Sequence, residues 1–179
     1  KPIVYYNNTA VNISNWNNNV SEIILCNADY SIINNVNISS SVRKSIGILL
    51  TLTDYANITN TNINNSYNGI YLKSGSNNVF VNVSSTSNDF FGFYLSSSSN
   101  NVFVNVSANA NDYCGFYLLY GSNNNVVQDS NIINNTDFDF YVSASTSADC
   151  NNLVVNVNGT DNKPIVYYNN TAVNISNWN

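Results

Sequence analysis

The most regularly spaced carboxylates in this sequence are Asp89, Asp112 and Asp137, which recur at nearly equal intervals along the chain. If consecutive repeats stack, these charges would repel one another unless they bind a cation, cap turns or share protons. Calcium would suit such a column, because it takes oxygen ligands in irregular geometry. We favour the structural alternative, in which each aspartate begins a turn by hydrogen bonding to the backbone two residues on. No cofactor is therefore expected, and calcium at these three residues is the secondary hypothesis.

Paired carboxylates could also provide the acid and the base of a glycoside hydrolase. However, the basic residues Arg43, Lys44 and Lys73 lie outside the repeats that carry these aspartates, and the sequence has no histidine. A uniform repeated surface also lacks the single cleft expected of an active site. We therefore expect no enzymatic activity and assign no catalytic residues.

Four tyrosines recur at the same spacing, each inside a short apolar segment. The segments have the form Gly-x-Tyr-Leu, except the last, Asp139-Phe140-Tyr141-Val142. Alternation along a strand places these tyrosines on the outer side. An aromatic strip of this kind could form a seam with neighbouring rods, a platform for sugar rings, or merely a stabilising stack. The four residues are Tyr71, Tyr94, Tyr117 and Tyr141.

These residues belong to a repeat of about 23 residues, a period typical of solenoid architectures. Residues 77–84 return unchanged as 100–107, and 89–95 return with two differences as 112–118. Each repeat contains two or three short alternating segments bounded by Asn, Ser, Gly or Asp, and none shows the 3.6-residue period of a helix. The pattern predicts an all-β fold, a right-handed parallel β-helix (β-solenoid) with about 23 residues per coil and roughly seven to eight coils.

In such a coil, alternation predicts that Val79, Val81 and Val83 face inward together with Ile70 and Leu72. A family of asparagines between apolar residues should then point outward or lie at a corner. Stacked amides can hydrogen bond to one another along the axis, and glycan attachment is the alternative for members in Asn-x-Ser/Thr sequons. This predicted asparagine column comprises Asn12, Asn37, Asn62, Asn82, Asn105, Asn131, Asn156 and Asn174. Further candidate glycosylation sites are Asn7, Asn19, Asn64, Asn134 and Asn158.

Residues 163–179 are identical to residues 1–17. We interpret 1–162 as one seven-coil β-solenoid unit and 163–179 as the start of the next identical unit. Solenoids normally protect their open ends with capping elements, and neither end of this sequence carries a capping helix or a charged stop. The sequence therefore predicts a polymer, or part of one, whose partner is another copy of itself.

The composition supports an extracellular protein. Asn makes up 42 of the 179 residues, charged residues only 8%, and the net charge is −5. So few basic residues exclude a nucleic-acid partner, and no apolar run is long enough to span a bilayer. The three cysteines, Cys26, Cys114 and Cys150, fall in different coils, which favours buried thiols over disulfides.

The coils written Asn-Asn-Val-x-Val-Asn-Val and Gly-x-Tyr-Leu resemble the parallel β-helix repeats of archaeal and bacterial surface proteins. These belong to the broad pectin-lyase-like group that includes the NosD-like, carbohydrate-binding-and-sugar-hydrolysis repeats. The resemblance implies a fold but not one function, because this coil hosts lyases, hydrolases, adhesins and surface arrays. Sheath and filament proteins built from tandem repeats match the 162-residue duplication best. We therefore expect a structural cell-surface solenoid that stacks end to end into a filament, sheath or array. The alternative is a β-helix that binds or processes carbohydrate such as surface polysaccharide.

Overall fold

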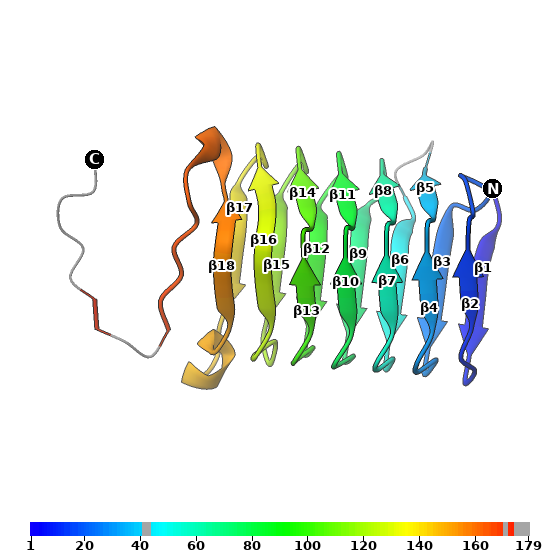
Figure 1. Cartoon of the computed structure of the whole chain (residues 1–179), viewed down its shortest axis with the longest axis horizontal. Coiled ribbons are helices and arrows are strands. Elements are labelled where there is room, and N and C mark those ends of the chain that lie inside the picture. Colours follow the sequence, from blue (N-terminus) through cyan, green and yellow to red (C-terminus); the bar gives the residue numbers. More distant parts are fainter. Residues whose placement is uncertain (41–43, 170–171, 174–179) are drawn as a thin grey trace.

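The computed structural model describes residues 1–40, 44–169 and 172–173. Within these ranges the chain winds into a stack of parallel strands, with the first coil at one end and the last at the other (Figure 1). Two short 3-10 helices, η1 (Ser147–Cys150) and η2 (Thr160–Asn162), lie near the C-terminal end. The fold is therefore a β-solenoid with almost no helix, as the sequence repeat predicted.

The first sheet takes one strand from each coil, and all its neighbouring strands pair in parallel. Along this sheet Tyr71, Tyr94 and Tyr117 are direct partners, each one repeat after the last. Stacking of successive coils therefore follows the sequence period. Its strands, in spatial order, are β1 (Ile3–Asn7), β3 (Glu22–Cys26), β6 (Ile46–Thr51), β9 (Asn68–Lys73), β12 (Phe91–Ser96), β15 (Cys114–Leu119) and β17 (Phe138–Ser143).

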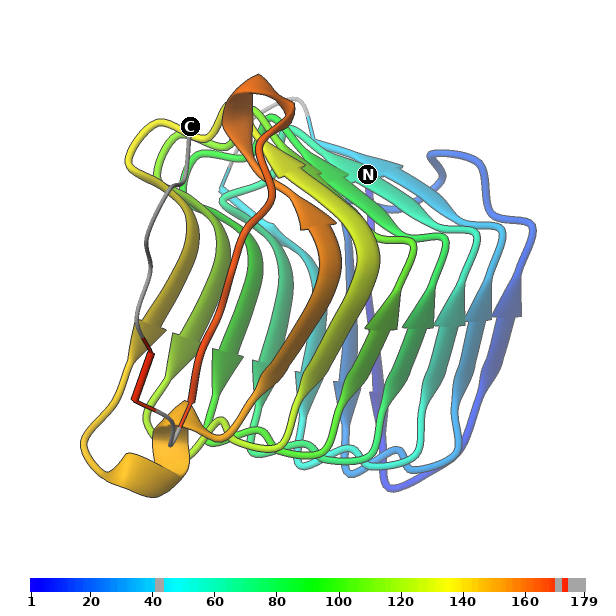
Figure 2. The same cartoon turned by 60° about the vertical axis from the view of Figure 1, so that its left-hand side comes forward.

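The second sheet takes two short strands from most coils and bends between them (Figure 2). Its first row consists of β2 (Asn12–Ser14), β4 (Ile32–Asn34), β7 (Asn57–Thr59), β10 (Val79–Val81) and β13 (Val102–Val104). Its second row consists of β5 (Asn37–Ser39), β8 (Asn62–Asn64), β11 (Ser84–Thr86) and β14 (Ser107–Asn109). The long strands β16 (Val126–Ile133) and β18 (Leu153–Asn158) span both rows.

The bend is made by one left-handed residue per coil. Such residues have φ between 49° and 61°, and asparagine and aspartate tolerate this conformation better than other side chains bearing a Cβ. The corner residues are Asn15, Asn35, Asn60, Asn82, Asn105, Asp129 and Asn156.

This corner overturns one expectation about which side chains face inward. Phe80 and Val83 are buried, whereas Val79 and Val81 lie half-exposed on the outer face. The left-handed residue Asn82 shifts the inside-outside alternation by one position, so the run from Val79 to Val83 is not one continuous strand. Ile70 and Leu72 are fully buried, as expected.

The interior consists of apolar columns that run along the stack. The rings of Phe80 and Phe103 stack at 4.7 Å, and those of Phe93 and Phe116 stack at 5.0 Å. Glycine is the second residue of the first-sheet strands β6, β9, β12 and β15, because the chain there passes close to the next coil. A Cβ on Gly92 would lie 2.6 Å from the carbonyl oxygen of Gly115. The recurring glycine is thus a packing requirement.

The second copy of the repeated sequence does not form a counterpart of β1. Residues 163–169 instead run across the C-terminal end of the stack, where an isolated bridge joins Asn158 to Pro164 (Figure 2). The same stretch of sequence therefore adopts two structures in one chain. The end of this second copy, including Asn174, lies outside the described residues.

Candidate functional surfaces

The four predicted tyrosines form one column on the outside of the first sheet. The ring centroids are 4.4 Å apart for Tyr71 and Tyr94, and 5.4 Å for Tyr94 and Tyr117. The distance is 5.3 Å for Tyr117 and Tyr141. Adjacent planes are inclined by 12°, 16° and 30°, so the rings lie nearly parallel. We call this column the tyrosine strip.

A second group of aromatic side chains flanks the tyrosine strip and was not part of the prediction. The ring of Phe91 contacts two strip members, with its centroid 4.8 Å from that of Tyr94 and 5.1 Å from that of Tyr117. The repeated segments Asp-Phe-Phe-Gly and Asp-Tyr-Cys-Gly carried this signal, because each places aromatic residues directly before the strand. With the tyrosine strip, these residues form what we call the aromatic face. The flanking residues are Tyr67, Phe90, Phe91, Tyr113 and Phe138.

The stacking decides what the tyrosine strip offers to a partner. Because each ring covers the face of the next, the strip presents ring edges and hydroxyl groups to the outside. Burial raises the pKa of Tyr94 to about 12, and the neighbouring phenols of Tyr71 and Tyr117 add to this shift. The middle of the strip is therefore neutral, apolar at its flanks and able to hydrogen bond at its rim.

The predicted asparagine column is wrong as a single column. Asn82, Asn105 and Asn156 are corner residues, whereas Asn37, Asn62 and Asn131 lie in the second row of strands. Asn12 lies in the first row, where its column continues with Ile32 and Asn57. All these asparagines stand between two apolar or small residues in the sequence, so they look equivalent. The strand register places them in different rows of the coil.

Asparagine ladders nevertheless exist on this outer surface. Asn82 donates its side-chain amide to Asn60 at 3.0 Å, and Asn105 donates to Asn82 at 2.8 Å. In the second row, Asn62 donates to Asn37 at 2.9 Å. The predicted amide bonding along the axis is thus confirmed, although it occurs in separate rows.

The most complete asparagine ladder is buried and was not predicted from the sequence. Its members Asn78, Asn101, Asn125 and Asn152 are at most 5% exposed. Each of the first three amides donates to the side-chain oxygen of the next member, at 3.0 to 3.2 Å. All four also donate to a backbone carbonyl of the preceding coil. We call this set the inner amide ladder. Its sequence signal was the second asparagine of the repeated Asn-Asn-Val.

A shorter buried ladder supports the opposite corner. Asn88 donates its amide to Asn111 at 2.9 Å, and Asn111 donates to Asn135 at 2.8 Å. The backbone N–H groups of Asn88 and Asn111 donate to the same two side-chain oxygens. These asparagine side chains therefore pair the turns of successive coils, which fixes the spacing of the coils.

The three predicted aspartates do not form one column. The backbone N–H groups of Asp89 and Asp112 donate to equivalent carbonyls of the preceding coil, those of Ser66 and Asn88. Thr136 takes the next place in this column, and Asp137 is displaced by one residue into the register of Tyr113. Among the described residues, no cluster of three or more acidic, Cys or His side chains could hold a metal ion. The geometry thus removes the three-carboxylate column on which the calcium hypothesis rested.

The candidate glycosylation sites differ in accessibility. Asn7, Asn19 and Asn134 are exposed, whereas Asn64 and Asn158 are half-buried. The nitrogen of Asn158 that a glycan would occupy also donates to Asn131 at 3.3 Å. Of the cysteines, Cys114 is buried, Cys26 and Cys150 are intermediate, and all three are free thiols.

These features define a class of protein: a parallel β-solenoid whose coils are joined by amide ladders and whose side carries an aromatic face. Residues 22–179 match the family model described as a right-handed β-helix region, and the chain belongs to that family. The match supplies the right-handed winding that the repeat length predicted. Comparison with curated proteins and with solved structures finds no significant match in either set. No helix within the described ranges has the length and apolar character of a membrane span.

Proposed function

We propose that this protein is a structural, non-enzymatic solenoid that stacks end to end into a filament, sheath or array at the cell surface. The observation that carries the proposal is that the apolar columns of the interior continue in one register from the first strand of the first sheet to its last. Val4 and Tyr6 in β1, and Phe140 and Val142 in β17, pack against the core but stay partly exposed. Their equivalents in the middle coils, such as Phe93 and Leu95, are fully buried.

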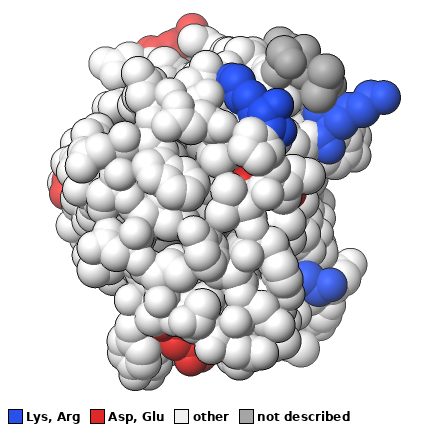
Figure 3. Space-filling model, turned by 90° about the vertical axis from the view of Figure 1, so that its right-hand side faces the viewer, with Lys and Arg blue, Asp and Glu red and all other residues white. Residues whose placement is uncertain are grey.

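The strand edges support the same proposal. β1 and β17 are the terminal strands of the first sheet, so among the described strands each has a neighbour on one side only. Free edges of this kind pair readily with another chain. Figure 3 shows the N-terminal end with few charged side chains over its middle. Stacking onto this end would bury few charges, which favours association.

The strand register specifies how two copies would join. Val4 stands at the head of the column that ends in Phe116 and Phe140, and Tyr6 at the head of the column that ends in Val142. Placing β1 of one copy on β17 of another would continue both apolar columns. It would also place Tyr5 beside Tyr141 and lengthen the tyrosine strip across the junction.

The aromatic face is the proposed lateral contact between neighbouring rods. Its edge-presenting rings and hydroxyl groups suit packing against a second aromatic face. A sugar platform needs ring faces, and the strip covers its own faces by stacking. Binding or processing of surface polysaccharide is therefore the weaker candidate function, and a co-sedimentation experiment distinguishes it from lateral packing.

The proposed role in a cell-surface sheath or filament follows from the resemblance of the coils to NosD-like repeats and to archaeal sheath and filament proteins. An Asn-rich, weakly charged surface with exposed sequons at Asn7, Asn19 and Asn134 suits an extracellular, glycosylated wall component. This supports a glycoprotein at the cell surface whose main partner is itself.

Electron microscopy of the assembled protein tests the proposal. End-to-end stacking predicts an axial reflection at about 4.8 Å and a layer line at about 34 Å, the height of seven coils at that spacing. Isolated short rods at every protein concentration would contradict it.

A double variant tests the lateral contact. Tyr94→Ala with Tyr117→Ala should keep the layer line of the seven-coil repeat and abolish side-by-side bundles. If this variant instead loses binding of a polysaccharide that the wild type retains in co-sedimentation, the carbohydrate function replaces the lateral contact.

A further inference from the structure

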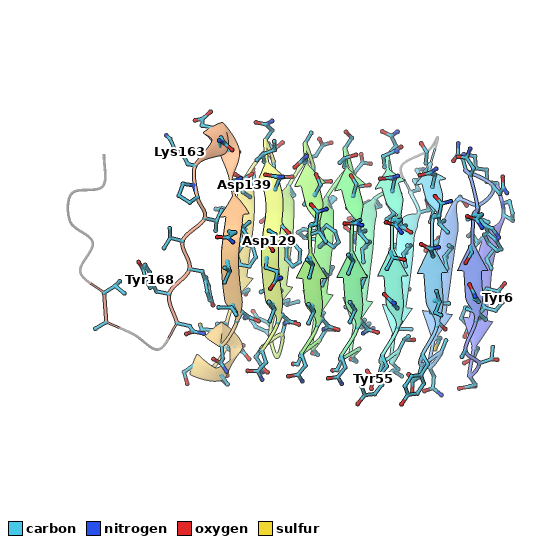
Figure 4. All side chains as sticks on the ribbon, in the orientation of Figure 1. Tyr6, Tyr55, Asp129, Asp139, Lys163 and Tyr168 are labelled. Carbon is cyan, nitrogen blue, oxygen red and sulfur yellow. The ribbon has the colours of Figure 1, made fainter. Side chains whose placement is uncertain are left out.

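The C-terminal end face is covered by residues 163–169, whose sequence is identical to that of residues 1–7. The two copies bury opposite sides of the same sequence. In β1, Val4 and Tyr6 are half-buried while Ile3 and Tyr5 are more than half exposed. In the second copy, Ile165 and Tyr167 are half-buried while Val166 and Tyr168 are exposed, at 43% and 49%. Figure 4 shows Tyr6 at one end of the stack and Tyr168 beyond β18 at the other.

A few contacts hold the second copy in place. The backbone N–H of Ile165 donates to Val157 at 2.8 Å, and the hydroxyl of Tyr167 donates to the carbonyl of Cys150 at 2.7 Å. The Tyr167 ring also meets the ring of Phe140 at 6.1 Å. Asn169 donates its amide to the carbonyl of Asn152 at 3.0 Å. These bonds replace the continuous ladder that β1 makes with β3.

The fit of this segment is loose. A cleft of about 520 Å³ lies between residues 164–167 and β18. A second cleft of about 410 Å³ lies beside Tyr167 and Asn169. Close-packed interiors contain few voids larger than a water molecule, so residues 163–169 cover the end face without completing it. The described strands also leave the outer edge of β17 unpaired.

We propose that residues 163–169 are a displaceable plug, and that the surface beneath them is the docking site for the first coil of a second copy. The inference rests on the proposed end-to-end function and adds the docking face and its control. The incoming β1 pairs with β17, so Val4 covers Phe140 in place of the Tyr167 ring. A first coil fits this surface better than the plug, because it brings a complete sheet edge and the inward side chains of the same columns.

The plug must leave before a second copy docks. The apparent affinity between copies is therefore the intrinsic affinity multiplied by the fraction of molecules whose end face is open. Tyr167→Ala removes the hydroxyl bond to Cys150 and the ring over Phe140, and should therefore free the end face. Tyr168→Ala is the matched control, because it removes the same side chain from the next, exposed position.

Sedimentation velocity over a concentration series, with electron microscopy of the products, measures the effect. Tyr167→Ala should assemble at a concentration about tenfold or more below that needed by the wild type and by Tyr168→Ala. The products should show the repeat of about 34 Å. Far-UV circular dichroism establishes that both variants keep their β structure.

A peptide supplies a second test. A synthetic peptide with the sequence of 163–169, added in excess, should suppress assembly of Tyr167→Ala. The same peptide with alanine at the position of Tyr167 should not.

Each other outcome is decisive. Equal assembly of wild type, Tyr167→Ala and Tyr168→Ala would overturn the plug and leave end-to-end stacking intact. Absence of assembly in all three at every concentration would overturn stacking itself, and the docking face with it. Products of Tyr167→Ala that lack the repeat would overturn docking on β17.

Discussion

One oxygen atom joins the buried turns of Asn78 and Asn101. The side-chain amide and the backbone N–H of Asn78 both donate to Oδ1 of Asn101, at 3.0 Å and 2.9 Å. Asn101 repeats this arrangement with Asn125. This position requires a side chain that accepts two hydrogen bonds from one coil and donates to others. Asparagine can do both, and an apolar side chain of similar size can do neither.

Replacing Asn101 should therefore be costly. Asn101→Leu leaves the backbone N–H of Asn78 and the carbonyl of Gly75 without their partner. Because each such buried group costs about 1–3 kcal/mol, we expect the free energy of unfolding to fall by roughly 2–5 kcal/mol. Urea unfolding followed by circular dichroism measures it. Asn57→Ala, at an exposed strand position, is the control and should change stability by less than about 0.5 kcal/mol.

Asn101→Asp separates hydrogen bonding from size. An ionised carboxylate cannot donate to Asn125 or to Gly75, and burial favours its neutral form. Because its folded pKa is raised, the folded state holds a proton that the unfolded state releases, so stability is lost as the pH rises. The deficit relative to wild type should therefore be smaller at pH 4 than at pH 8. A deficit independent of pH would show that the donated bonds contribute little.

The corner residue Asn82 tests the left-handed bend. Its φ is 57°, a conformation that costs a β-branched residue of order 1–3 kcal/mol and glycine nothing. Asn82→Val should lower the free energy of unfolding by about that amount. Asn82→Gly should lose only the exposed amide bonds to Asn60 and Asn105, worth roughly 1 kcal/mol or less together. Equal losses in the two variants would mean that the ladder, and not the backbone, stabilises the corner.

Gly92 tests the close approach at the start of β12. A Cβ there would lie 2.6 Å from the carbonyl oxygen of Gly115 and 2.9 Å from Nδ2 of Asn111. Gly92→Ala must therefore shift the backbone, which costs typically about 1–3 kcal/mol. Gly121→Asn is the control, because the nearest atom to its Cβ lies 3.5 Å away and asparagine tolerates its φ of 71°. Thermal unfolding should show a lower Tm for Gly92→Ala alone.

The tyrosine strip should be visible in an alkaline titration. Burial and the adjacent phenols raise the pKa of Tyr94 from 10.0 to about 12. The unfolded chain releases this proton near pH 10 and the folded chain near pH 12, so between these values the contribution of Tyr94 to stability falls as the pH rises. Absorbance at the tyrosinate band should show a late component that Tyr94→Phe removes. Tyr120→Phe, at an exposed position, should leave that component in place.

Much of the coil could be predicted from the sequence. The spacing of Gly69, Gly92 and Gly115 predicted the period, and it placed Tyr71, Tyr94 and Tyr117 in one column. These predictions hold because a stack of nearly identical coils converts a fixed sequence distance into a fixed spatial step. The position of a residue along the solenoid axis can thus be predicted from its place in the sequence repeat.

The orientation of a side chain around the coil was harder to predict. Val81 and Val83 look equivalent in the alternating pattern, but the left-handed Asn82 between them places one outside and the other inside. Asp137 looks like a third member after Asp89 and Asp112, which stand five residues before Tyr94 and Tyr117. Asp137 stands only four residues before Tyr141, so Thr136 takes its place in the register. Alternation is a rule for continuous strands, and it restarts at each corner.

The sequence by itself determined the β-solenoid, its period, its apolar interior and the tyrosine strip, because these depend on residue type and spacing alone. Only the tertiary structure decided which asparagines are buried, which valines face outward and how the two copies of the repeated sequence differ. Val4 and Tyr6 face the core where β3 provides a strand to pair with, whereas Ile165 and Tyr167 do so where the segment crosses an open end. The same residues bury different side chains because burial depends on the neighbours, and the chain supplies different neighbours at its two ends.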